Sequence, residues 1–290
     1  MPAPTLTVPP PSLCVTPDPL TPESFSPFGT AISCPLPRDL SSAPSRLSSL
    51  PPHDPAPILA NQGSALKYSP ISPLRNDYVA GACPSGKPAE ARMSMFSCFP
   101  RTLRKIGVDD GSGTTMTRVR VVDRGKKEKV AKREVFDVRI LERHPFTTQT
   151  FIPIDLSSWS HAGGVEEPVF LVVVAPTLKG EVAEAEVEVA GSGSTPGKRK
   201  KKVLIRDPPD LRNLKAFVAR GGQAVTYGAG TWHAPMVVLG QRRVDFVVVQ
   251  FANGVDEEDC QEVAFGEGVV VDLGKGGDYG RSSLDRFAKL

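Results

Sequence analysis

The feature that most constrains the fold is a series of short apolar segments, running from Ala91 to Phe251, with the two-residue period of β-strands. Glycine, proline and polar residues separate these segments, and nothing after residue 91 has the spacing of a long amphipathic helix. Many short antiparallel strands predict a mainly β fold, a sandwich, jelly roll or barrel, with the continuous apolar run FLVVVA in its middle. The expected strands are ARMSMFSCF, MTRVRVV, EVFDVRIL, TFIPI, VFLVVVA, KAFVAR, QAVTY, MVVLG and VDFVVVQF.

The segment before these strands carries the signals of one short helix. Thr21 and Ser24 stand at a possible N-terminal cap, Pro22 suits the first turn, and Gly29 provides a stop. We therefore expect a helix at about residues 21–27, followed by a strand.

Composition divides the chain into one domain with two flanking segments. Proline-rich and strongly charged stretches interrupt the strand pattern and indicate surface insertions. The predicted parts are a Pro-rich N-terminal arm at 1–19, a single domain at 20–272, insertions at about 35–60, 107–133 and 179–207, and a C-terminal tail at 273–290.

Charge and cysteine usage exclude several classes of protein. The 35 basic and 32 acidic residues give a net charge of +3, which does not indicate a nucleic-acid partner. No apolar stretch is long enough to span a membrane, the N-terminus has no signal-peptide pattern, and the five cysteines form no C-x-x-C pair. We expect a soluble cytoplasmic protein without a disulfide framework, a zinc ribbon or a membrane or nucleic-acid partner.

The basic run KRKKK at 198–202 has two interpretations. It is compatible with a nuclear localisation signal or a nucleic-acid patch. An acidic run at 181–188 lies beside it and no aromatic residue is interleaved, which favours a solvated surface loop.

Four polar residues stand out within or beside expected strands. Glu142 and His144 are two residues apart, so their side chains project from the same face of a strand, whereas Arg143 points to the other face. Gln149 follows across a turn, and His233 comes much later, after a glycine-rich turn. This spacing resembles the two-part metal motif of the cupin superfamily, although Glu142 stands where a histidine is usual and Gln149 where a glutamate is usual.

Longer segments resemble one particular family. ERHPFTTQTFIPI, VFLVVVA, DLRNLKAFVARGGQAVTYGAGTWHAPM and VDFVVVQF are similar to the ureidoglycolate lyase (ureidoglycolate hydrolase) family of allantoin degradation. LTPESFSPFGTAI and NQGSALKY resemble the family's first helix and strand. The resemblance covers about residues 20–75, 91–100, 135–175 and 208–262.

The resemblance implies a cupin-like antiparallel β-barrel of the jelly-roll type, with a few short peripheral helices, that forms a homodimer. It also implies cleavage of (S)-ureidoglycolate to glyoxylate and urea. Such cleavage needs proton transfer and charge stabilisation, for which His233, His144 and Glu142 are the catalytic candidates. Glu142, His144, Gln149 and His233 would instead be ligands if a divalent metal of the nickel, manganese or zinc type is bound, and a site without metal is the open alternative.

Three further residues are candidates for binding the substrate. Gln149 suits the ureido group because an amide both donates and accepts hydrogen bonds. Tyr227 matches a family position, and Lys215, in phase with Phe217, is a candidate for the substrate carboxylate, with an outward solvated lysine as the alternative. Bacterial relatives tend to have an Asn-Arg pair where this chain has Phe96 and Ser97. The family's anchor for the substrate carboxylate therefore cannot be carried over to this chain.

Two other functions remain open at the level of sequence. The first is an amidohydrolase that releases ammonia from the same substrate. The second is a non-catalytic cupin that binds a small acid, since a fold does not fix a function.

Overall fold

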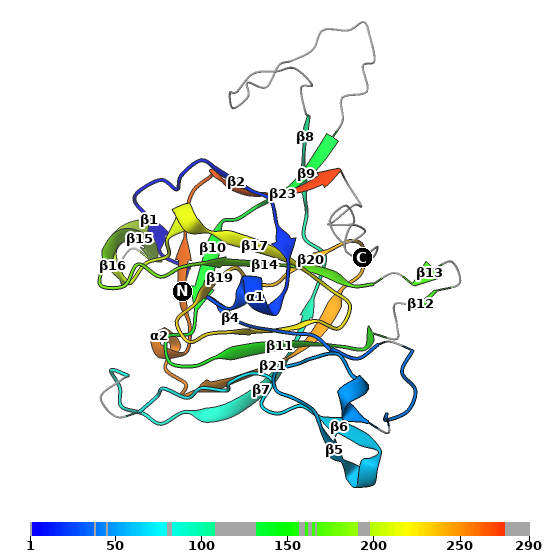
Figure 1. The fold of residues 1–290 in the computed structure, drawn as a ribbon. Coiled ribbons are helices and arrows are strands. Elements are labelled where there is room, and N and C mark those ends of the chain that lie inside the picture. The colour runs from blue at the N-terminus through cyan, green and yellow to red at the C-terminus, as the bar shows by residue number, and fades with distance from the viewer. Residues whose placement is uncertain are drawn as a thin grey trace, which may run out of the picture.

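The computed structural model shows a mainly β protein built from stacked sheets (Figure 1). Its described residues are 2–37, 39–44, 46–79, 83–107, 132–156, 160–161, 164–165, 167–190 and 198–275.

The largest sheet has ten strands and is mostly antiparallel. In spatial order its strands are β16 (Lys198–Arg206), β15 (Val182–Ala190), β1 (Thr5–Leu6), β22 (Gln261–Ala264), β10 (Ile140–Arg143), β19 (Trp232–His233), β14 (Val169–Ala175), β17 (Lys215–Arg220) and β3 (Asp18–Pro19), with β20 (Val237–Leu239) also paired to β14.

Two smaller sheets lie on either side of it. The five-stranded sheet runs β4 (Gly29–Ile32), β18 (Ala224–Tyr227), β11 (Gln149–Ile154), β21 (Val244–Ala252) and β7 (Glu90–Cys98). The four-stranded sheet runs β2 (Leu13–Val15), β23 (Val269–Lys275), β9 (Lys132–Asp137) and β8 (Arg104–Gly107). Two hairpins complete the strands: β5 (Ile58–Ala60) with β6 (Ala65–Lys67), and β12 (Ser160–His161) with β13 (Gly164–Val165).

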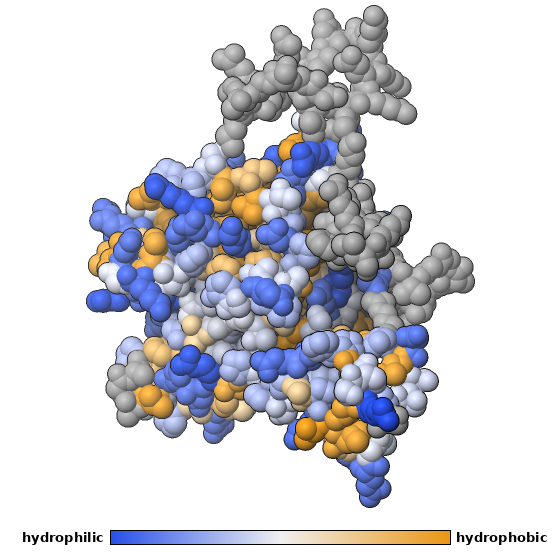
Figure 2. Space-filling model, in the orientation of Figure 1, coloured by the Kyte–Doolittle hydropathy of each residue, from blue (hydrophilic) through white to orange (hydrophobic). Residues whose placement is uncertain are grey.

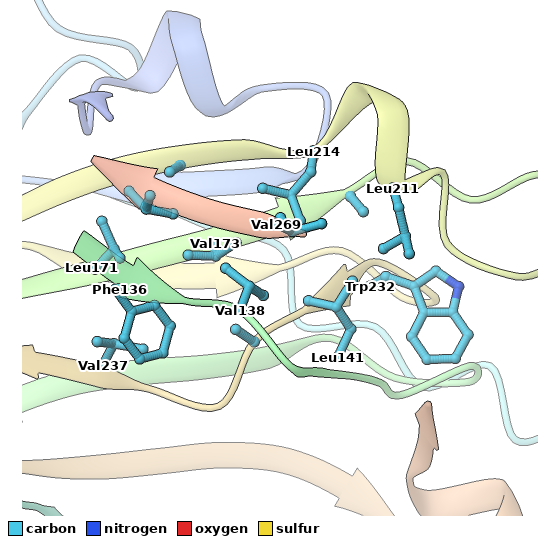
Figure 3. Close-up of a cluster of buried hydrophobic side chains, with 14 of the residues drawn as sticks. Phe136, Val138, Leu141, Leu171, Val173, Leu211, Leu214, Trp232, Val237 and Val269 are labelled. Atoms are coloured by element: carbon cyan, nitrogen blue, oxygen red, sulfur yellow. The ribbon is translucent and has the colours of Figure 1, made fainter. Parts of the chain in front are cut away.

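The ten-stranded sheet has a hydrophobic core on each face. Leu171 and Val173 of β14 belong to the core shared with the four-stranded sheet, part of which Figure 3 shows. Val172 and Val174 face the other core, which is shared with the five-stranded sheet. A strand buried on both faces reads as a continuous apolar run, so the central position predicted for FLVVVA is confirmed.

The mainly β architecture is confirmed, but the described strands form separate sheets rather than one closed barrel. Most of the expected strands coincide with observed ones, and EVFDVRIL is divided between β9 and β10. The expected strand MTRVRVV lies at 116–122, outside the described residues. The cupin-like barrel therefore stays a prediction.

The predicted short helix is confirmed as α1 (Pro22–Phe25). Thr21 Oγ1 accepts a hydrogen bond of 3.2 Å from the backbone N–H of Ser24, which closes the first turn. Phe25 is fully buried and packs edge-to-face against Phe217. The second helix is α2 (Asp256–Asp259), and single 3-10 turns lie at 47–49, 61–63 and 211–213. None of the helices in the described ranges is long and apolar enough to cross a membrane.

The first nineteen residues contribute short strands to two of the sheets. β1 pairs with β15 and β22, β2 pairs with β23, and β3 pairs with β17. The arm is thus held along the domain surface by backbone hydrogen bonds.

The basic run 198–202 forms most of β16, whose partner β15 contains the acidic run. Lys200 Nζ lies 3.0 Å from Glu186, and Lys202 Nζ lies 3.7 Å from Glu184. Two lysines of the basic run thus lie opposite glutamates of the acidic run across one hairpin, in agreement with a solvated surface segment. Figure 2 shows a separate apolar patch on the β5–β6 hairpin, where Ile58 and Leu59 are exposed.

Candidate active site

Glu142 and His233 are brought together by strand pairing. They lie directly opposite each other on β10 and β19, so their side chains project from the same face of the ten-stranded sheet. The Oε1 atom of Glu142 is 3.4 Å from Nε2 of His233. His144 follows directly after β10, and one ligand atom from each of the three residues lies within 4.8 Å of the others. The catalytic trio predicted from the sequence is therefore a real cluster in space.

His233 is fixed by contacts on each side of its ring. Its Nδ1 is 2.9 Å from the carbonyl oxygen of Thr231, which places the proton of the neutral ring on Nδ1. The ring of Tyr227 stacks on it, with centroids 3.9 Å apart and planes inclined by 11°. Only 1% of the His233 surface is exposed, and its Nε2 faces Gln149 of the five-stranded sheet.

His144 has the same arrangement of its ring nitrogens. Its Nδ1 is 2.6 Å from the carbonyl oxygen of Asp259, at the end of α2. Its Nε2 is buried and has no hydrogen-bond partner among the described residues. A buried nitrogen without a partner is costly, so this lone pair is available to accept a hydrogen bond or to bind a metal.

The charges of the cluster follow from burial and mutual contact. Burial and the neighbouring His233 lower the pKa of His144 to about 4, so its ring is neutral near pH 7. Burial opposes ionisation of Glu142, but its contact with the His233 ring and, to a smaller extent, the nearby His144 outweigh burial. The pKa of Glu142 therefore lies below its ordinary value, and the carboxylate is ionised.

Gln149 reaches the cluster from the opposite sheet. Its Oε1 is 3.2 Å from Nε2 of His233, and its Nε2 donates a 2.7 Å hydrogen bond to Oε1 of Gln250. The sequence did not lead us to include Gln250 in the site. Its position was an available signal, because Gln250 is a polar residue in the apolar strand VDFVVVQF and shares a face with the buried Phe246 and Val248.

Arg143 of β10 and Trp232 of β19 lie on the opposite face of the ten-stranded sheet from the cluster. Arg143 points to the opposite face, as predicted, where its guanidinium lies 4.7 Å from the ring centroid of Trp232. It also donates hydrogen bonds to the carbonyl oxygens of Arg206 and Asp207. Trp232 is fully buried and donates a 3.0 Å hydrogen bond to the carbonyl oxygen of Asp207.

Two predicted substrate-binding residues lie at different depths. Tyr227 is buried beside His233, and burial raises the pKa of its phenol, which stays protonated. Lys215 is exposed and lies two strands from His233, across Val174, on the same face of the sheet. The structure brings Tyr227 to the cluster and leaves Lys215 at its margin.

The donor set fits a cation. The converging atoms are a carboxylate oxygen, an amide oxygen and two imidazole Nε2 atoms, and none of them brings a hydrogen when both rings are neutral. Each imidazole directs Nδ1 to a backbone carbonyl, the usual arrangement behind a metal-binding histidine. A proton or a divalent transition ion would relieve the repulsion among these lone pairs.

The lowered pKa of His144 predicts a pH-dependent stability. Between pH 6.5 and 4 the unfolded chain binds a proton at this histidine and the folded chain does not, so the free energy of unfolding falls as the pH falls. We expect His144 to contribute a loss of about 2 kcal/mol between pH 7.5 and pH 5, measured by urea unfolding. His144→Gln should lack this component, whereas His53→Gln should retain it. An unchanged slope in His144→Gln would contradict the assignment.

The fold and the cluster define a class: a mainly β protein with a largely buried His–Glu–His cluster between two sheets, suited to proton transfer or to metal binding. The chain belongs to the ureidoglycolate lyase family, whose sequence pattern it matches over residues 12–272.

Relatives from distant organisms agree with this placement. A ureidoglycolate lyase of Schizosaccharomyces pombe is 30% identical over 242 residues, which cover 83% of this chain and 86% of the relative. A ureidoglycolate lyase of Saccharomyces cerevisiae is 30% identical over 255 residues, covering 87% and 94%. One of Burkholderia mallei is 29% identical over 147 residues, covering 51% and 58%.

Proposed function

We propose that the protein is a ureidoglycolate lyase that cleaves (S)-ureidoglycolate to glyoxylate and urea. The observation that carries the proposal is the cluster of Glu142, His144 and His233, with a buried and unpartnered nitrogen, in a chain of this family. A cupin-like fold, a homodimer, a cytoplasmic location and a role in allantoin degradation complete the proposal.

The reaction moves one proton within the substrate. The hydroxyl loses its proton, its oxygen becomes the carbonyl of glyoxylate, the carbon–nitrogen bond breaks, and the departing urea nitrogen gains a proton. In the site without metal, Nε2 of His233 accepts the hydroxyl proton, and the same ring then protonates the nitrogen. The Glu142 carboxylate, 3.4 Å away, stabilises the positive ring between the two steps.

Two neighbours orient the substrate for this transfer. The neutral His144 offers its Nε2 lone pair to a hydrogen-bond donor of the substrate, such as an N–H of the ureido group. Gln149 presents its amide to the ureido group, and Tyr227 fixes the plane of the His233 ring by stacking. The buried setting strengthens each of these interactions relative to water.

A divalent metal is the other use of the same residues. Glu142, His144 and His233 would hold it, with the Gln149 oxygen as a weaker neutral ligand. When bound, the ion supplies Lewis-acid stabilisation of the negative charge that develops on the substrate oxygen.

We expect the protein to take up one divalent ion of the nickel, manganese or zinc type per chain, measured by elemental analysis after dialysis. Glu142→Gln should weaken the affinity roughly 10- to 100-fold, since it replaces an anionic ligand by a neutral one. Full activity after exhaustive chelation, with no metal detected, would contradict this and leave the four residues as proton-transfer groups.

The function itself is tested with pure protein and racemic ureidoglycolate. Glyoxylate and urea should appear in equal amounts, and half of the racemate should remain. Release of ammonia instead of urea would identify the amidohydrolase, and absence of glyoxylate with and without added metal would leave a binding protein.

A further inference from the structure

A row of side chains across the five-stranded sheet leads from the active site to an unpartnered arginine. Tyr227 lies opposite Gln149, and Gln149 is hydrogen-bonded to Gln250 on the next strand. Gln250 in turn lies opposite Arg92, on the edge strand β7. Since neighbouring strands are about 5 Å apart, the Cα atom of Arg92 is about 10 Å from that of Gln149, a gap that an arginine side chain bridges in large part.

The orientation of Arg92 follows from its strand. Directly opposed residues of antiparallel strands share a face, and residues two apart on one strand share it too. Phe96, four residues after Arg92, stacks on Phe151 of the buried core, with ring centroids 5.9 Å apart. Arg92 therefore lies on the face of the sheet that carries Gln149 and Tyr227.

A second cation lies beside Arg92, next to the loop that holds His144. A Cβ atom built on Gly254 would lie 3.5 Å from Nζ of Lys87 and 3.7 Å from Nη2 of Arg92. The backbone N–H of Gly254 donates a hydrogen bond to Oδ2 of Asp259. The backbone carbonyl oxygen of Asp259 in turn accepts a hydrogen bond from Nδ1 of His144. Both cations are exposed, and neither side chain has a hydrogen bond or ion pair within the described ranges.

The arginines that follow β7 are already engaged elsewhere. Arg104 forms a two-bonded ion pair with Asp137, at 2.8 and 2.9 Å. Arg101 lies over the ring of Phe136, 5.9 Å from its centroid. Arg101 and Arg104 are therefore engaged, whereas the side chains of Arg92 and Lys87 are not engaged within the described residues.

We propose that Arg92, with Lys87 beside it, binds the carboxylate of the substrate. The proposal rests on the proposed function, since ureidoglycolate and glyoxylate both carry a carboxylate and urea does not. A guanidinium can hold a carboxylate through two parallel hydrogen bonds, which fixes the substrate end that does not react. The hydroxyl-bearing carbon then lies between that anchor and His233.

The test compares the two products as inhibitors of the wild type and of Arg92→Gln. The inhibition constant for glyoxylate should rise roughly 10- to 100-fold, because a charged hydrogen-bond donor is lost. The constant for urea should stay unchanged. Arg92→Lys should lie between the two, and Lys87→Gln should raise the glyoxylate constant a few-fold.

Met93→Gln is the matched control, because Met93 is the next residue of the strand and is exposed on the opposite face. The proposal is overturned if Arg92→Gln leaves the inhibition constant for glyoxylate unchanged, or raises the constant for urea by the same factor. It is also overturned if Lys215→Gln raises the glyoxylate constant more than Arg92→Gln does. Calorimetric titration of glyoxylate into the wild type and Arg92→Gln needs no turnover. It therefore separates failure of this subsite from failure of the proposed lyase activity, and an absence of glyoxylate binding to the wild type also overturns the subsite.

Discussion

His233→Ala should lower kcat/KM for ureidoglycolate by about a thousandfold or more, measured as glyoxylate release. The substitution would remove the group proposed to accept the hydroxyl proton, or one of the proposed metal ligands, and it removes the imidazole nitrogen 3.4 Å from Glu142 Oε1. It also removes the ring against which Tyr227 stacks. We therefore expect the substitution to affect both the proposed proton transfer and the packing of the site.

His53→Ala is the matched control for this variant. His53 lies in another segment of the chain, before the site strands. Its ring packs edge-on to Tyr68, and its Nδ1 is within hydrogen-bond distance of the carbonyl oxygen of Pro55. It should retain wild-type activity. Because a buried histidine is being removed, the thermal unfolding of His233→Ala must also be compared with the wild type. A folded His233→Ala protein with more than a tenth of the normal activity would refute the catalytic assignment.

Trp232→Ala should lower the free energy of unfolding by about 4 kcal/mol, measured in urea. The indole is fully buried in the core of Figure 3, and its loss leaves a cavity that the surrounding strands cannot fill. The substitution also removes the surface on which the Arg143 guanidinium lies.

Trp232→Phe separates the parts of this effect. It keeps most of the apolar volume and loses the hydrogen bond to Asp207, so we expect a cost of about 1–2 kcal/mol with near-normal kcat at moderate temperature. If Trp232→Phe were fully stable but inactive, Trp232 would belong to the site rather than to the core.

Strand periodicity accounts for the part of the site that the sequence could predict. An alternation of two residues is a local property, so Glu142 and His144 could be placed on one face and Trp232 opposite His233. The helix at 21–27 followed from a cap and a proline within the same few residues. In each case the signal and the structure lie within one short segment.

The parts that could not be predicted depend on pairing between distant segments. Gln250 joins the site because β21 lies beside β11, and Asp259 because its carbonyl faces His144. The pairing register that brings Arg92 opposite Gln250 leaves no trace in local composition. The basic run is a different case, because the acidic run beside it in the sequence already indicated its partner, and the hairpin adds only the pairing register.

The division of the site between two sheets has a consequence for how activity is acquired. Glu142 and His233 belong to the ten-stranded sheet, whereas Gln149 and Tyr227 belong to the five-stranded one. A refolding chain that has formed both sheets but has not yet docked them has its strand content without its catalytic geometry. We therefore expect enzyme activity to be recovered only when the two sheets dock, later in refolding than the appearance of β-structure.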